Sequence, residues 1–200
     1  TLVSQDKLVG TYEITPSTPV NKPVWQFRHT ASNVIDMHLR TLAPMFRLAS
    51  WTLHFKFEFR SNFQQVGQCL VVQHNMPLKT VWYLLDKTVM SSDEDAIFSS
   101  YKLMTLLPHT KVAMGEDVDV NATLNWNIPV EGSQSIKAGY EWKSQTSHVP
   151  PSEYEMGSIF VIAPIGMEIA NGVTPSMTVR IWSHLSGLKL SAYDPSDQLI

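Results

Sequence analysis

The stretch Trp51–Pro77, WTLHFKFEFRSNFQQVGQCLVVQHNMP, holds two different strand patterns side by side. In its first half apolar and polar residues alternate, as in a strand with one face buried. The apolar positions are Trp51, Leu53, Phe55, Phe57 and Phe59. After a polar break, the run Cys69–Val72 is apolar throughout, which is typical of a strand covered on both faces. The stretch therefore predicts two strands, 51–60 with one face covered and 67–74 with both faces covered.

The same two patterns recur in the rest of the chain. Residues 117–129 alternate as 51–60 do, and residues 157–164 are apolar on both faces. Further runs rich in β-branched and aromatic residues predict strands at 7–16, 23–30, 109–115 and 178–192, the last one bent near Gly187. No strand–helix–strand alternation indicates a parallel sheet. Eight strands of this kind predict an all-β fold, an eight-stranded antiparallel jelly-roll β-sandwich.

Two short helices are expected in the connections between strands. Four apolar residues fall at helical spacing and predict a helix over 33–43: Ile35, Leu39, Leu42 and Phe46. Ser32 or Asn33 can cap this helix, and Pro44 should end it. The segment SSDEDAIFSSY has the spacing of a capping box and predicts a second helix over 92–101. Residues 1–200 are thus expected to form a single domain.

The composition favours a protein that associates with others. Charged residues make up 16% of the chain, below the roughly 25% of ordinary soluble proteins. A surface with so few charges suggests burial against partners, although a β-rich domain with a polar uncharged surface has the same composition. The net charge is −3 without any Lys/Arg cluster, so contacts with nucleic acid are expected to be weak or shared.

Redox and targeting signals are few. A single cysteine, Cys69, excludes an intrachain disulfide framework and agrees with a reducing compartment. No apolar run is long enough to predict a membrane span. Thr1 in place of an initiator Met suggests release from a longer precursor or a shortened chain.

Candidate reactive groups each have a simpler explanation. Cys69 with His54 or His74 could form a nucleophile–base pair, but Cys69 falls in a strand predicted to be buried. The seven histidines include no His-x-His or HExxH pattern that binds a metal. Asp117 and Asp119 share one face of a strand, where carboxylates are usually solvated. We therefore predict no catalytic residue, no metal ligand and no cofactor.

Other short motifs carry no predicted site. The acidic trio Asp93–Asp95 suits the first turn of a helix. The sequon Asn121–Thr123 falls in mid-strand and is interpreted as a chance match. No glycine-rich segment has the spacing and the lysine of a phosphate-binding loop.

The long irregular segment 130–156 holds the candidate interface residues. Segments of this length within a domain are usually functional or interfacial. Tyr140 and Trp142 are aromatic residues in a polar segment, and they either anchor a partner or fix the segment to its own domain. Pro150 and Tyr154 are the other two interface candidates.

The order of these elements resembles the capsid proteins of picorna-like viruses, and among them a small coat protein of a plant or invertebrate virus. The resemblance covers roughly Leu8 to Leu190 and rests on three groups of residues. They are Trp51, Gly67, Leu70, Val72 and Pro77; Trp126, Ile128 and Pro129; and the segments MGSIFVIAP and TVRIWSHLSGLKL. The resemblance implies that the strands, lettered B to I along the chain, form two sheets with the orders BIDG and CHEF. Strands 67–74 and 157–164 should then pair, and the apolar side of 51–59 should be buried.

The resemblance also implies a function. The chain would be a non-enzymatic capsid subunit that assembles with sister coat proteins into a non-enveloped icosahedral shell around positive-strand RNA. Its expected partners are the other capsid chains of the virion, the enclosed RNA through weak contacts and a host receptor. It would be found in the virion, and in the host-cell cytoplasm during assembly. The alternative is a jelly-roll module that binds carbohydrate or another ligand, with Tyr140 and Trp142 stacking on sugars.

Overall fold

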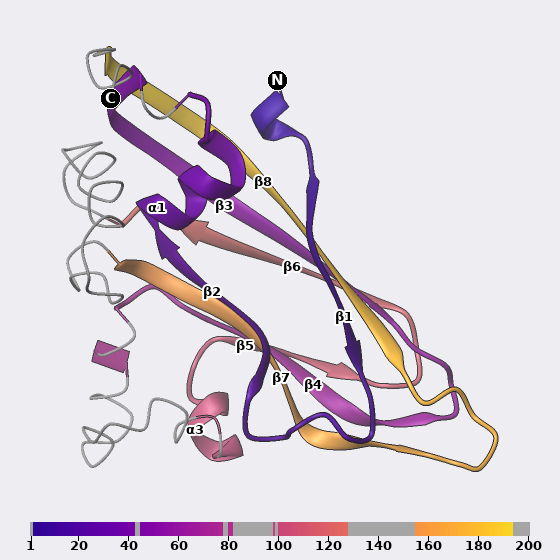
Figure 1. The fold of residues 1–200 in the computed structure, drawn as a ribbon. Helices are drawn as coiled ribbons and strands as arrows, with labels where there is room; N and C mark the ends of the chain where they lie inside the picture. The colour runs from indigo at the N-terminus through magenta and orange to yellow at the C-terminus, as the bar shows by residue number, and fades with distance from the viewer. Residues whose placement is uncertain are drawn as a thin grey trace.

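The chain forms two four-stranded antiparallel sheets packed face to face in a computed structural model (Figure 1). The structure describes residues 2–42, 45–77, 80–81, 98, 100–127 and 155–193. The first sheet has the order β1 (Lys7–Ile14), β8 (Met177–Tyr193), β3 (Phe46–Arg60), β6 (Val118–Asn125). The second has the order β2 (Pro23–Thr30), β7 (Glu155–Ile169), β4 (Gln65–His74), β5 (His109–Ala113). These are the BIDG and CHEF sheets of a jelly roll, so the predicted fold class is confirmed.

Two strands extend further than their hydrophobic patterns indicated. β3 begins at Phe46 rather than residue 51, because its first residues pair with the end of β8, where Phe46 faces Tyr193. β7 covers Glu155–Ile169 rather than 157–164, because its last residues pair with the start of β4. Pairing across strands, which no local pattern reports, sets these ends.

The remaining strands end close to the expected positions. β4 begins at Gln65 and not at residue 67, and β8 covers Met177–Tyr193. β1 ends at Ile14, β5 at Ala113 and β6 at Asn125, each short of its expected end. Residues 128–129 of the expected strand 117–129 lie outside the described residues.

The first helical segment differs from the prediction at both ends. A helix α1 (Ala31–Val34) continues into a π-helical turn η2 (Ile35–Leu39), and a 3-10 turn η1 (Leu2–Ser4) precedes β1. The Asn33 N–H donates to the Thr30 hydroxyl at 3.3 Å, so Thr30 caps the helix in place of Ser32 or Asn33. The helix ends at Leu39 and not at 43; Leu42 is 36% exposed. Pro44 lies outside the described residues.

Of the second predicted helix, 92–101, the structure describes only Phe98, Ser100 and Tyr101. Helix α3 (Tyr101–Thr105) follows the predicted helix 92–101 and shares only Tyr101 with it. Ser100 is its N-cap, and its hydroxyl accepts a hydrogen bond from the Leu103 N–H at 3.3 Å. Residues 92–97 and 99 lie outside the described residues.

The main core lies between the two sheets. All five apolar residues of the opening pattern are at most 2% exposed, as predicted: Trp51, Leu53, Phe55, Phe57 and Phe59. The ring of Trp25 meets Phe55 and Phe57 edge-on, with centroids 5.3 and 5.7 Å apart. Edge-to-face contacts of this kind add to the burial of aromatic surface.

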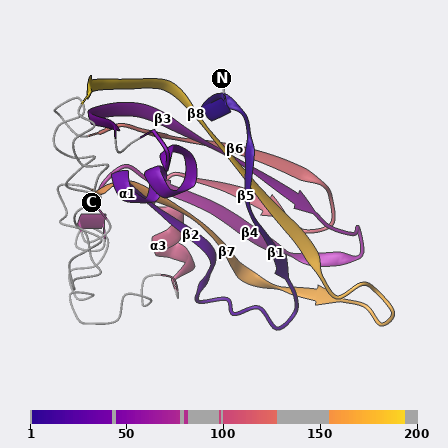
Figure 2. The same cartoon turned by 45° about the horizontal axis from the view of Figure 1, so that its top comes forward.

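A second apolar cluster explains the continuous apolar runs of β4 and β7. Alternate residues of these paired strands point away from the first sheet and are fully buried: Leu70, Val72, Phe160 and Ile162. Met104 of α3 and Leu107 cover them, together with Val81 and Phe98. Figure 2 shows α3 on the outer side of this sheet. The second sheet is therefore covered on both faces, as the sequence predicted.

Replacement of residues in the outer cluster should cost as much stability as replacement in the main core. Phe160→Ala and Phe57→Ala should each lower the free energy of unfolding by about 3–5 kcal/mol, because both side chains are fully buried. Lys111→Ala is the control, since Lys111 pairs with Leu70 on the same side of the sheet but is exposed; it should change stability by less than about 0.5 kcal/mol. Urea denaturation measures all three, and a small loss for Phe160→Ala would contradict a doubly covered sheet.

Glycines permit two irregularities of the strands. At Gly157 φ is +131°, and a Cβ there would strike the His74 carbonyl oxygen and lie 2.9 Å from Asn75 Cα. Gly187, with φ +58°, lies where β8 gains one residue relative to β3 between the pairs Thr52–Ser186 and Ser50–Lys189. This β-bulge is the bend predicted near Gly187.

The two glycines separate a steric effect from a conformational one. Gly157→Ala should destabilise the protein by at least about 3 kcal/mol, because it adds both a backbone clash and a φ nearly restricted to glycine. Gly187→Ala should cost only about 1–2 kcal/mol, because a Cβ there meets nothing within 4 Å. Thermal unfolding of both variants tests this order, and equal losses would rule out the close approach at Gly157.

Candidate functional site

Cys69 does not form a nucleophilic pair with either candidate histidine. Its side chain is fully buried in the main core, and burial raises the pKa of the thiol to about 12. The reactive form of cysteine is the thiolate, which is disfavoured here. Both ring nitrogens of His74 have other partners: Nδ1 donates to the Met76 carbonyl at 2.8 Å, and Nε2 accepts from the Ser158 hydroxyl.

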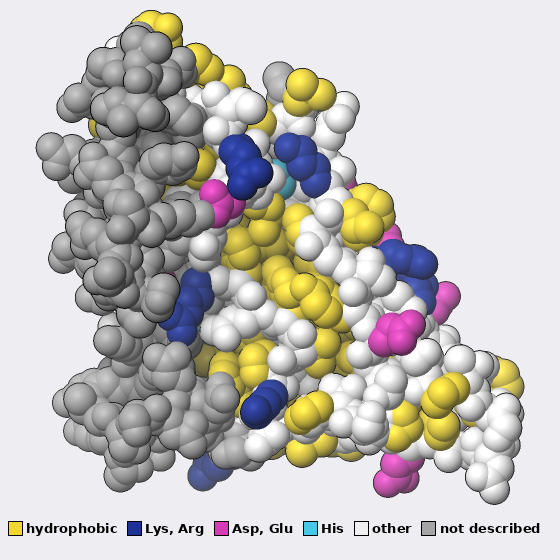
Figure 3. Space-filling model, viewed as in Figure 1, with side chains coloured by type: hydrophobic (Ala, Val, Ile, Leu, Met, Phe, Trp, Pro, Cys, Tyr) yellow, Lys and Arg dark blue, Asp and Glu magenta, His cyan; other side chains and the backbone are white. Residues whose placement is uncertain are grey.

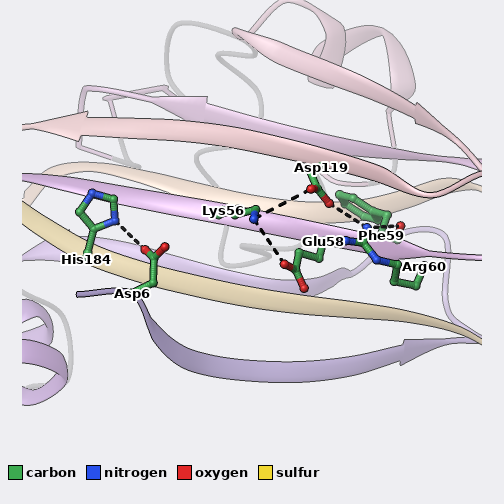
Figure 4. Close-up of polar contacts among 7 residues, drawn as sticks. All are labelled: Asp6, Lys56, Glu58, Phe59, Arg60, Asp119 and His184. Carbon is green, nitrogen blue, oxygen red and sulfur yellow. Dashed lines mark hydrogen bonds and ion pairs between the residues drawn. The ribbon is translucent and has the colours of Figure 1, made fainter. Parts of the chain in front are cut away.

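Of the two candidate carboxylates, Asp119 of β6 contacts the end of β3 (Figure 4), and Asp117 contacts Ser61, which follows β3. Asp119 Oδ1 accepts a hydrogen bond from Arg60 Nη1 at 2.7 Å, which lowers the pKa of the carboxyl. Lys56 Nζ lies 3.9 Å from Asp119 Oδ2. Asp117 Oδ1 accepts from the Ser61 N–H at 3.3 Å. These carboxylates link the end of β3 to the start of β6 through hydrogen bonds and ion pairs. The described residues include no group of three His, Cys, Asp or Glu that could hold a metal ion.

A pair of histidines stacks on the outer face of the first sheet. His54 of β3 and His184 of β8 face each other, with ring centroids 4.5 Å apart and planes within 9°. Asp6 Oδ1 lies 2.7 Å from His184 Nδ1 (Figure 4), and Ser186 Oγ lies 2.6 Å from His54 Nε2. Partial burial, and then the neighbouring His184, lower the pKa of His54. These four side chains form a polar network on this face.

Three histidines are buried: His29, His38 and His74. His29 Nε2 accepts a hydrogen bond from Trp51 Nε1 at 2.9 Å, and His38 Nε2 lies 2.9 Å from Ser183 Oγ. Burial is the largest cause of the lowered pKa of each ring, to about 3 for His29 and to about 4 for His38 and His74. The folded protein therefore holds all three rings neutral.

Stability should fall as the pH is lowered. The ordinary pKa of histidine is 6.5. Below this pH the three histidines bind protons in the unfolded chain, but they stay neutral in the folded chain until the pH reaches their lowered pKa values. Each of the three histidines should reduce the free energy of unfolding by up to about 1.4 kcal/mol per pH unit between pH 6.5 and about 4. Urea denaturation across this range measures the slope. In His29→Gln the amide oxygen can still accept the hydrogen bond from Trp51. The dependence of the free energy of unfolding on pH should be weaker in this variant by the contribution of one proton. An unchanged slope would mean that His29 is protonated when folded.

Exposed apolar residues gather at one end of the sandwich, in a group named here the tip patch: Val20, Phe63, Val66 and Ile165. Phe63 is 80% exposed, Val66 64%, Ile165 52% and Val20 48%. The start of β4, with Val66, pairs with the β7 segment that contains Ile165, and Val20 Cγ1 lies 3.6 Å from the place a Cβ on Gly166 would take. Sequence reasoning missed this patch, although Phe63 and Val66 are apolar residues within a polar turn segment.

A second apolar surface, named here the edge patch, lies between the edge strands β1 and β2. Four partly buried side chains of these strands pack against the main core: Val9, Tyr12, Val24 and Trp25. Figure 3 shows hydrophobic side chains gathered in the middle of this face, with charged side chains around them. An apolar centre with a polar rim is the ordinary composition of a protein–protein interface.

The predicted interface residues cannot be compared with these patches. Tyr140, Trp142, Pro150 and Tyr154 all lie outside the described residues. Among the described helices, none has the length and hydropathy needed to cross a membrane.

Known proteins resemble this chain in structure but not in sequence. No family model and no curated protein matches it. A chain of sacbrood virus of honeybee superposes with a TM-score of 0.67 at 13% identity, covering 96% of this chain and 74% of that one. A chain of black queen cell virus gives 0.68 at 9% identity, covering 97% and 72%. A chain of the Triatoma virus empty capsid gives 0.66 at 12% identity, covering 96% and 93%.

The agreement extends over nearly the whole chain and includes both sheets. At identities of 9–13% it establishes the fold. The chain has the jelly-roll fold of the capsid proteins of picorna-like viruses.

Proposed function

We propose that the chain is a structural capsid subunit, a single jelly-roll domain over residues 1–200 that assembles with sister coat proteins into an icosahedral shell. The observation that carries the proposal is the structural likeness to chains of these virus capsids over 96–97% of this chain. A domain fold alone does not define a function. The exposed apolar surfaces add independent support.

The tip patch and the edge patch are suited to association with other protein chains. Stable interfaces bury about 1,200–2,000 Å² and have apolar centres. The tip patch and the edge patch lie on different parts of the molecule, so one subunit can contact more than one neighbour, as closed symmetric assemblies require. Tyr140, Trp142, Pro150 and Tyr154 remain predicted interface residues.

Contacts with the enclosed RNA are proposed to be weak or shared. The outer face of the first sheet carries Lys56, Arg60 and Arg180 against Asp6, Glu58 and Asp119. These charges balance, and the net charge of the whole chain is −3. Strong phosphate binding requires an excess of Lys and Arg. We place the chain in the virion, and in the host-cell cytoplasm while the shell forms.

Co-expression with the coat proteins encoded beside it tests the proposal. The expected result is particles in negative-stain electron microscopy that contain all the coat proteins in equal amounts. A chain that stays monomeric with its sister proteins under all assembly conditions would contradict the proposal. Specific binding on a glycan array by such a monomer would favour the carbohydrate-binding alternative.

Polar substitution in the tip patch should prevent assembly without unfolding the subunit. In the double variant Phe63→Ser/Val66→Ser, both side chains are largely exposed, so the melting temperature should stay within a few degrees of the parent. Particle yield should fall strongly, because apolar contact area between subunits is lost. Gln64→Ser, an exposed polar residue of the same turn, is the matched control and should leave the yield unchanged. Full assembly of the double variant would show that the tip patch lies outside the interfaces.

A further inference from the structure

The turn that joins β7 to β8 presents an Asn–Gly pair to solvent. The Val173 N–H donates to the Ala170 carbonyl at 3.3 Å, which makes Asn171 and Gly172 the two central residues of a β-turn. Gly172 has φ +84° while Asn171 has negative φ, as in a type II turn. Both residues are exposed, and Figure 1 shows this connection projecting from the end of the sandwich.

This pair is unique in the chain. Of the eight asparagines, Asn171 alone is followed by glycine; the others precede Lys, Val, Phe, Met, Ala, Trp and Ile. A side chain on the following residue shields the backbone nitrogen from the asparagine amide, whereas glycine has none. A Cβ at Gly172 would meet nothing within 4 Å, so the surroundings give no shielding either. The turn bond uses the Val173 N–H, which leaves the Gly172 N–H outside it.

The base of the turn is held while its tip is free. Gln65 Nε2 donates to the carbonyls of Thr174 and Ser176, each at 2.8 Å, and so ties the start of the β8 side to β4. Ile169 pairs with Gln65 on the β7 side. Asn171 and Gly172 lie between these two anchors, where a local change of backbone dihedrals disturbs no buried contact.

We propose that Asn171 is a site of spontaneous deamidation, with water as the only co-reactant. The Gly172 backbone nitrogen loses its proton to water and attacks Asn171 Cγ, forming a C–N bond. The side-chain Nδ2 takes up a proton and leaves as ammonia, which gives a five-membered succinimide. Water then opens this ring. Cleavage of the bond from the imide nitrogen to Cγ gives aspartate, and cleavage of its bond to the Asn171 backbone carbonyl carbon gives isoaspartate. No oxidation or reduction occurs.

The product changes the end of the molecule that holds the tip patch. Each event replaces a neutral amide by a carboxylate and makes the net charge of −3 one unit more negative. Isoaspartate also adds a methylene group to the backbone of the turn. Its effect on subunit contacts rests on the proposed function, but the modification itself does not depend on it.

Peptide mapping of the aged protein tests the proposal. The purified folded chain is incubated at mildly alkaline pH and digested, and every asparagine is followed by mass spectrometry. Isoaspartate is detected by labelling with a protein isoaspartyl methyltransferase. Asn171 should convert before any other asparagine, a more acidic band should appear in isoelectric focusing, and both changes should be lost in Asn171→Gln. Asn21→Gln, at another exposed asparagine, is the matched control. In this variant Asn171 should convert at the same rate as in the parent protein.

The unfolded chain provides the second comparison. The same assay in urea gives the rate at Asn171 without the fold, and the folded rate should be of similar size because the turn tip is unshielded. An intact Asn171 in the folded protein, beside conversion in urea, would show that the turn protects it and would overturn the proposal. Earlier conversion of another asparagine in the folded protein would overturn it equally.

Discussion

The structure depends on the burial of β4 and β7 from both sides. Neighbouring residues of one strand, such as Val71 and Val72, point into different apolar clusters, so neither cluster forms without the other. The main core requires the first sheet, and the outer cluster requires α3 and the residues around it. A strand apolar on both faces would expose one of them in a simple two-layer sandwich. The described parts of the connection between β4 and β5 provide this second cover through Val81, Phe98, Met104 and Leu107.

Hydrogen bonds fix the tautomers of two buried histidines, His29 and His74. Trp51 Nε1 donates to His29, so the proton of that neutral ring is on Nδ1. In His74 the Met76 carbonyl requires the same tautomer, which leaves Nε2 to accept from Ser158. Since desolvation disfavours imidazolium in all three buried rings, the packing that stabilises the sandwich also makes it sensitive to acid.

The inward side of β3 could be predicted from the sequence pattern, because side-chain alternation with period two fixes the face of every residue once a core exists. The sheet order and the pairing of β4 with β7 were predicted from the resemblance to capsid proteins, since alternation alone does not say which strands are neighbours. Helical periodicity was a weaker guide: Phe46, counted in the predicted helical stripe, lies in β3, because pairing with β8 outweighed local spacing. The tip patch was missed for a related reason. Whether Phe63 is buried depends on what lies beyond its turn, and no local pattern contains that information.

The charged side chains and the exposed apolar side chains lie on different surfaces of the molecule. Outward-facing residues of the first sheet compensate one another across strands, as Arg60 does with Asp119, so this face gains little by binding a charged partner. The tip and edge patches carry apolar side chains whose exposure costs free energy until a neighbour covers them. In the proposed capsid subunit, association would therefore involve the strand edges and the turns at the end of the sandwich. The proposed shell would be stabilised mainly by apolar burial, and its stability should depend less on salt than on the integrity of those turns.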